Sequence, residues 1–134
     1  PKPSSAASDV YKRQLVNPVL TEGQLHGGVA QGIGQALMEF VSFDENTGQL
    51  LSGSLMDYTL PRAAMLPNFE ATLEGAPTKA NVLGVKGVGQ AGCIAAPQTI
   101  VHAVLNALSP LKIIHLDMPL TSQSIWRAIS ASRA

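Results

Sequence analysis

Apolar positions in the first half of the chain predict one helix that is rich in glycine. Its apolar face is formed by residues that recur every three or four positions, namely Val29, Ile33, Leu37 and Phe40. Thr21 precedes this face and Gln24 follows three residues later, as in a capping box, so we expect the helix to begin at Thr21. Each glycine inside a helix costs about 0.5–1 kcal/mol relative to alanine. The segment contains Gly23, Gly27, Gly28, Gly32 and Gly34. We therefore expect its backbone to pack closely against another element or a ligand.

The middle of the chain has the alternation and the turn residues of short strands. A hairpin is predicted for residues 41–51, with Gly48 at a position of positive φ. Residues 54–58 are expected to be extended, and two prolines make residues 60–68 a loop. Polar and apolar residues alternate over residues 69–74, which predicts a half-buried strand.

A stretch with four glycines, residues 84–93, is the feature around which the second half is organised. It predicts a tight loop that presents backbone groups beside the start of a helix over residues 97–108. A short strand at residues 112–116 and a last helix capped by Thr121 follow, with Trp126 on its apolar face. The pattern as a whole predicts an α+β fold, in which short mixed strands pack with about three helices.

Composition limits the domain organisation. The 134 residues make one domain at most, and they are 46% hydrophobic but only 13% charged. So little charge is typical of a part of a larger protein, whose other segments cover its interfaces. Residues 1–14 form a Pro/Ser/Ala-rich tail without an apolar targeting segment, so we exclude them from the domain and expect them to lack structure. Residues 15–131 are the predicted domain, with a cytoplasmic location.

Charge and cysteine content argue against several classes of function. The net charge is zero and the basic residues are scattered, which argues against nucleic acid as a partner. No apolar run approaches the roughly 18 residues that span a bilayer, which argues against a membrane protein. The single cysteine, Cys93, cannot form an internal disulfide, and the three histidines lack metal-ligand spacing, so no metal site is predicted.

Three segments carry a resemblance to a known family. They are Lys86-Gly87-Val88-Gly89-Gln90-Ala91-Gly92, the glycine-rich segment 23–37, and residues 50–61 with Tyr58 and Pro61. In their order along the chain, they resemble the C-terminal part of the molybdopterin-binding large subunit of molybdenum hydroxylases, the family of xanthine dehydrogenase, aldehyde oxidase and CO dehydrogenase. The resemblance implies the C-terminal piece of a larger molybdopterin-binding domain, which is inactive alone.

The resemblance also implies an activity, a cofactor and partners. The family hydroxylates an aldehyde or an N-heterocycle with oxygen from water, at a molybdopterin cofactor that in bacteria is often the cytosine dinucleotide form. Implied partners are the rest of the large subunit and iron–sulfur and FAD subunits or domains. Gln24 matches the glutamine that binds the pterin, and Gly87, Val88 and Gly89 match the cofactor loop. A capping box is the structural alternative for Gln24.

Gln90 departs from the family pattern, which has the catalytic glutamate at this place. A carboxamide has no basic lone pair near neutral pH and cannot accept the proton. Losing a general base typically costs about 10²–10⁴ in rate. Four explanations stay open: an impaired enzyme, a different base, a protein that only binds cofactor, or a one-nucleotide sequence error.

Two other functions fit the same residues. Gly87-x-Gly89-x-x-Gly92 matches a dinucleotide-binding fingerprint, which would require a buried strand before it and a helix directly after it. Alternatively, the chain is a non-catalytic interaction fragment whose glycines serve packing. An enzyme predicts a polar pocket around Gln24 and Gln90, whereas packing alone predicts that both side chains are exposed or bonded locally.

Overall fold

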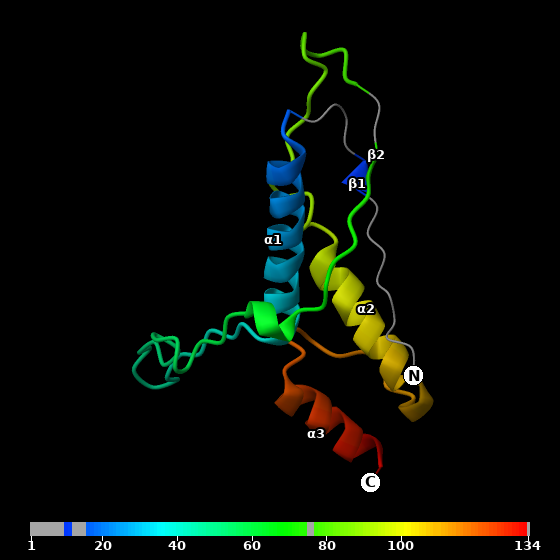
Figure 1. The fold of residues 1–134 in the computed structure, drawn as a ribbon. Coiled ribbons are helices and arrows are strands. Elements are labelled where there is room, and N and C mark those ends of the chain that lie inside the picture. Colours follow the sequence, from blue (N-terminus) through cyan, green and yellow to red (C-terminus); the bar gives the residue numbers. More distant parts are fainter. Residues whose placement is uncertain (1–9, 12–15, 75–76, 134) are drawn as a thin grey trace.

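The computed structural model describes residues 10–11, 16–74 and 77–133. Two helices lie side by side, and a third lies beyond the C-terminal end of the first (Figure 1). In chain order the elements are β1 (Val10–Tyr11), α1 (Pro18–Leu37), η1 (Ala63–Met65), β2 (Leu73–Glu74), α2 (Ala96–Leu108), η2 (Ser109–Leu111) and α3 (Ser122–Ser132). The helices predicted from the sequence are therefore present.

Helix α1 begins earlier than the sequence predicted. Asn17 is its N-cap, because the Asn17 Oδ1 atom accepts a hydrogen bond of 3.1 Å from the Leu20 N–H. Pro18 occupies the first turn, where its missing N–H costs nothing. Thr21 lies one turn inside the helix, where its hydroxyl donates to the Asn17 carbonyl at 2.9 Å. The predicted start at Thr21 was wrong, since Asn followed by Pro is a stronger start signal.

The hydrophobic core is small and lies where α1 meets α2. Its buried apolar side chains are Leu25, Ile33 and Ala36 of α1, Ala96 and Leu108 of α2, and Leu120. The Leu120 N–H donates to the Ala36 carbonyl at 2.6 Å, which ties the segment before α3 to the last turn of α1. Thr121 caps α3 as predicted, with its Oγ1 accepting from the Ser124 N–H at 3.2 Å.

The middle of the chain forms the predicted hairpin but not the predicted extended segment. Phe43 and Leu50 form an antiparallel bridge, and Gly48 has a φ of +69°. This hairpin projects away from the helices (Figure 1). Residues 54–58 form a turn instead of an extended segment. The Ser54 carbonyl accepts from the Tyr58 N–H at 2.8 Å, while the Ser54 hydroxyl bonds to Asp57 at 2.9 Å. These side-chain bonds favour the turn over a strand.

The predicted layer of mixed strands is not seen among the described residues. Strands β1 and β2 form one short parallel pair, with Val10 opposite Leu73 and Tyr11 opposite Glu74. Val10 and Tyr11 belong to the tail that was expected to lack structure. Residues 112–116, predicted as a strand, form no ladder in the described chain, because no neighbouring segment pairs with them.

Many large apolar side chains remain in solvent. They include Met56 at 93% exposure, Ile114 at 87% and Trp126 at 65%. The sequence predicted Trp126 on an apolar face of the last helix, but none of the described α3 residues is buried. Within the described part of the chain, no helix combines the length and the apolar character that crossing a membrane requires.

Candidate functional site

The glycine loop that precedes α2 is built from consecutive turns. At its base the Asn81 side chain holds Val85, donating to its carbonyl at 2.9 Å and accepting from its N–H at 3.1 Å. Gly84 follows Asn81 with a φ of +63°, a conformation that favours glycine. Further on, the Gln90 carbonyl accepts from the Cys93 N–H at 3.1 Å and the Ile94 N–H at 3.2 Å. The backbone around Gln90 is thus fixed before α2 begins.

Two glycines bring this loop into backbone contact with α1. A Cβ atom built on Gly92 would lie 2.4 Å from the Leu25 carbonyl oxygen and 2.9 Å from the Val29 nitrogen. A Cβ atom built on Gly28 would lie 2.9 Å from the Cys93 nitrogen. These distances are too short for any side chain, and the neighbouring atoms belong to the backbone. Gly28 and Gly92 are therefore required for the contact, as the glycine content of α1 predicted.

The same close packing continues along α1 towards its C-terminal end. A Cβ atom on Gly32 would lie 2.4 Å from the Cβ atom of Ala96 and 3.0 Å from Pro97 Cδ. One turn of α1 therefore packs on the loop, and the next packs on the first turn of α2. The loop and the start of α2 are held on one face of α1.

Other glycines of the two segments face open space. Added Cβ atoms at Gly23, Gly27, Gly87 and Gly89 would meet nothing within 4 Å among the described residues. On α1 the open glycines lie beside Gln24, and on the loop they precede Gln90. Of the nine glycines in the two segments, four are explained by contacts within the chain and Gly84 is explained by its positive φ, while these four are not.

Gln24 and Gln90 each lie close in sequence to a residue of the same backbone contact. Gln24 immediately precedes Leu25, whose carbonyl meets Gly92, and Gln90 lies two residues before Gly92. Both side chains are exposed, and neither makes a hydrogen bond within the described residues. Gln24 is not part of a capping box, because α1 is capped at Asn17. Exposure of both glutamines is the outcome that the packing alternative predicts for the described chain.

A wide cleft in the molecule lies away from these glutamines. It is formed by the last turn of α1, the loop around Thr59 and Met65, and the start of α3. Neither Gln24 nor Gln90 lines it. The polar pocket that an enzyme was expected to form around them is not enclosed by this chain alone.

Glu39 and Tyr58 form a side-chain pair that the sequence did not predict. The Tyr58 hydroxyl donates to Glu39 Oε2 at 2.5 Å, and this hydrogen bond raises the pKa of Tyr58 above its usual value. Gly34 leaves the room for this pair, since a Cβ atom there would lie 2.4 Å from Glu39 Oε1 and 2.8 Å from Pro61 Cδ. No local pattern indicates the pair, because 19 positions separate its members. The pair fixes the Tyr58–Pro61 segment to the end of α1.

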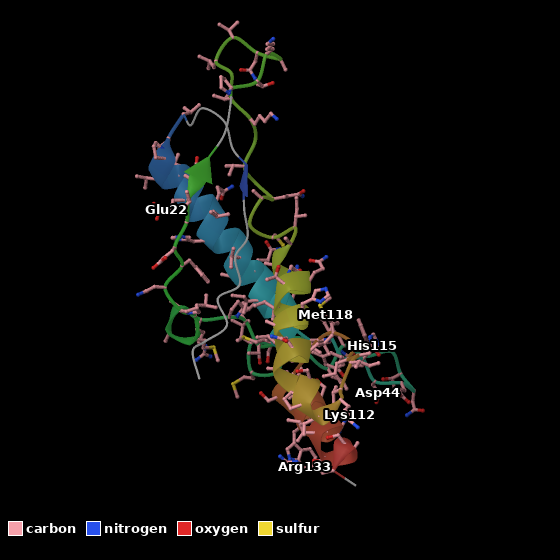
Figure 2. The ribbon with its side chains drawn as sticks, turned by 90° about the vertical axis from the view of Figure 1, so that its right-hand side faces the viewer. Glu22, Asp44, Lys112, His115, Met118 and Arg133 are labelled. Carbon is pink, nitrogen blue, oxygen red and sulfur yellow. The ribbon has the colours of Figure 1, made fainter. Side chains whose placement is uncertain are left out.

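On α1, His26 Nε2 lies 3.9 Å from Glu22 Oε1, and His26 directly follows Leu25 of the glycine contact. Figure 2 shows Glu22, Asp44 and Arg133 on separate parts of the molecule. His115 pairs with Asp117 at 3.1 Å, and both are exposed. In the ranges that the structure describes, no three His, Cys, Asp or Glu side chains are grouped so that they could hold a metal ion.

The dinucleotide fingerprint lacks the structural context it requires. Residues 81–86, which precede Gly87, form turns and coil rather than a strand among the described residues. Further turns separate Gly92 from the start of α2 at Ala96. The strand–turn–helix unit that binds a dinucleotide is therefore not formed here.

Sequence comparisons find a matching family and similar proteins. Residues 13–67 match a family described as the molybdopterin cofactor-binding domain. The chain is 40% identical over 114 residues to the nicotine 6-hydroxylase large subunit of Paenarthrobacter nicotinovorans, covering 85% of this chain and 14% of that protein. It is 36% identical over 114 residues to the carbon monoxide dehydrogenase large chain of Hydrogenophaga pseudoflava, with the same coverage of each chain. The chain thus spans 14% of the length of these curated relatives.

Solved structures agree with the sequence comparisons. Quinoline 2-oxidoreductase from Pseudomonas putida 86 superimposes with a TM-score of 0.82 at 37% identity, covering 88% of this chain and 15% of that chain. A Cu,Mo-CO dehydrogenase superimposes with a TM-score of 0.84 at 29% identity, covering 91% of this chain and 15% of that chain. The arrangement of α1, the glycine loop and α2 therefore occurs within much longer proteins.

Proposed function

Because this chain belongs to the family of molybdopterin-binding large subunits of xanthine dehydrogenase, aldehyde oxidase and CO dehydrogenase, we propose that it provides one wall of a molybdenum hydroxylase active site. The parent protein would oxidatively hydroxylate an aldehyde or an N-heterocycle. The observation that supports this proposal is the family match, together with the position of Gln24 and Gln90 close in sequence to one backbone contact between α1 and the glycine loop.

The residues on this surface fit a molybdopterin. The pterin ring has an edge of amide and amine groups, and the carboxamide of Gln24 can both donate and accept hydrogen bonds to such an edge. Gly89 has open space among the described residues where a Cβ atom would lie, so a flat group can approach the loop backbone beside Val88. We propose Gln24, Gly87, Val88 and Gly89 as cofactor contacts. The cytosine dinucleotide form is the expected variant of the cofactor.

Position 90 would face the reacting groups. When bound, the molybdenum cofactor supplies the oxygen transfer and accepts the electrons of the hydroxylation. The Gln90 carboxamide can orient a hydroxyl group by hydrogen bonding, but it cannot hold a proton near neutral pH. The chain therefore offers a binding group at the place where the family has its base. We propose that the parent enzyme with Gln90 is impaired in proton transfer.

The remaining parts of the active site would come from elsewhere in the parent protein. Neither Gln24 nor Gln90 lines the described cleft, and most of the length of the relatives lies outside this chain. We therefore propose that the chain is inactive alone and that it assembles with the rest of the large subunit and with iron–sulfur and FAD subunits or domains. A cytoplasmic location is part of the same proposal.

Molybdenum content of the purified parent subunit tests the cofactor contact. Gln24→Ala removes the proposed hydrogen bonds to the cofactor. One well-placed hydrogen bond contributes about 1.4 kcal/mol, which corresponds to a tenfold change in cofactor affinity. We therefore expect molybdenum per subunit to fall by about tenfold when the cofactor is limiting. Gln35→Ala is the matched control, because Gln35 is also an exposed glutamine on α1. Equal molybdenum contents in the two variants would contradict a role for Gln24 in binding.

A further inference from the structure

We propose that Gly28 and Gly92 are positioning residues, which set the loop that carries Gln90 at a fixed distance from the helix that carries Gln24. This inference rests on the proposed function, because it concerns how two residues of that surface are held relative to each other. It assigns a role to two glycines whose Cβ positions are filled by backbone atoms of this chain.

The contact between these glycines leaves no room for adjustment. A Cβ atom at Gly92 would lie within 3.0 Å of the Leu25 oxygen and the Val29 nitrogen, both in the backbone of α1. A Cβ atom at Gly28 would lie 2.9 Å from both the Cys93 nitrogen and the Gly92 Cα. Helix backbone cannot swing away as a flexible side chain can. An added methyl group must therefore push the loop off the helix.

Displacement of the loop would reach position 90 directly. The Cys93 N–H, which lies against Gly28, donates to the Gln90 carbonyl at 3.1 Å. The next residue, Ile94, donates to the same carbonyl at 3.2 Å. Gln90 is thus bonded to the residues that sit on α1, and it moves with them. On α1, Gln24 immediately precedes Leu25, whose carbonyl oxygen contacts Gly92.

The spacing of the two glutamines can be measured in the 134-residue chain. Nitroxide labels at Gln24→Cys and Gln90→Cys, in a Cys93→Ser background, give a distance distribution by pulsed electron resonance. We expect one narrow distribution, which Gly92→Ala shifts or broadens. The control is Gly53→Ala, which adds the same methyl group where the nearest atom lies 3.8 Å away. We expect this control to leave the distribution unchanged.

The catalytic consequence is measured in the assembled parent subunit carrying Gln90→Glu. A misplacement of about 1 Å can cost about 100-fold in rate. We therefore expect Gly92→Ala to lower kcat per bound molybdenum by about 10- to 100-fold with little change in KM. A purely structural role would instead lower molybdenum content and total activity together, and would leave kcat per bound molybdenum unchanged.

The outcomes separate this inference from the function it rests on. An unchanged label distance in Gly92→Ala overturns the inference. So does the unfolding of both Gly28→Ala and Gly92→Ala chains while Gly53→Ala stays folded, because the contact would then serve stability alone. If the Gln90→Glu subunit binds no molybdenum at all, the proposed function fails, and the label distances still decide whether the glycines set the spacing.

Discussion

At the scale of single residues, substitution of Gln90 gives a prediction for both stability and activity. The Gln90 side chain is exposed, and its backbone is held by hydrogen bonds that do not involve the side chain. Gln90→Glu should therefore change the free energy of unfolding by less than about 0.5 kcal/mol. Because a carboxylate can accept a proton, we expect dye-linked hydroxylation by the assembled enzyme to rise by about 10²–10⁴. Equal activity of both forms would mean that the proton acceptor lies elsewhere.

Tyr58 gives a prediction about pH. Its pKa is raised above 10.0, first by the hydrogen bond to Glu39 and also by burial and by the Glu39 charge. A raised pKa means that the folded state holds the phenolic proton more tightly. The stabilisation is therefore complete below the unfolded value of 10.0 and is lost as the pH rises through the folded value.

The titration of Tyr58 can be followed by phenolate absorbance. Tyr11→Phe leaves Tyr58 as the single tyrosine, since the chain has two. We expect the midpoint above 10.0, and we expect Glu39→Gln to lower it because the negative charge is removed. A midpoint that does not respond to Glu39→Gln would show that the pair does not form in solution.

At the scale of elements, neighbouring glycines of α1 should respond in opposite directions. Gly27→Ala adds a methyl group in open space, so it should stabilise the chain by about 0.5–1 kcal/mol through helix propensity. Gly28→Ala should destabilise it by about 1–3 kcal/mol, since its methyl group meets the loop backbone. Urea unfolding of the two variants checks this, and changes of the same sign would contradict the observed packing.

The helices were predictable because their signals are local. The apolar spacing over 97–108 and the Thr121 cap predicted α2 and α3 within a residue or two. The start of α1 was missed because two local signals compete, and Asn17 with Pro18 prevails over Thr21. The turn at 54–58 was missed because the Ser54–Asp57 hydrogen bond replaces extended structure. Strand residues at 112–116 need a partner strand, which local sequence cannot supply.

The candidate site was predictable only in part. The cost of five glycines in one helix indicated close packing, but not which glycines take part. Gly28 meets Gly92 across more than sixty positions of sequence, and no local pattern encodes that pairing. The roles of Gln24 and Gln90 came from the family resemblance and stay predictions. The backbone contact between α1 and the glycine loop, which lies close to both residues in sequence, came from the structure.

At the scale of the whole molecule, exposed apolar surface dominates. Trp126, the single tryptophan, is 65% exposed on α3. At low concentration its fluorescence should resemble that of an indole in water and should be quenched by iodide. Raising the concentration should shift the emission to the blue if copies associate through this surface. A strongly shielded tryptophan at every concentration would contradict the exposure of α3 in the single chain.

The contact between α1 and α2 also indicates where the connectivity of the chain can be changed. Helix α1 meets the glycine loop and the start of α2 through residues 25–32 and 92–97, while the hairpin between the two helices projects outwards (Figure 1). The hairpin tip at Thr47 and Gly48 is thus part of a closing loop rather than of the contact. Doubling the length of a flexible loop costs only about 0.6 kcal/mol of closure entropy. A peptide tag inserted at this tip, or new termini created there by circular permutation, should leave the helix pair assembled.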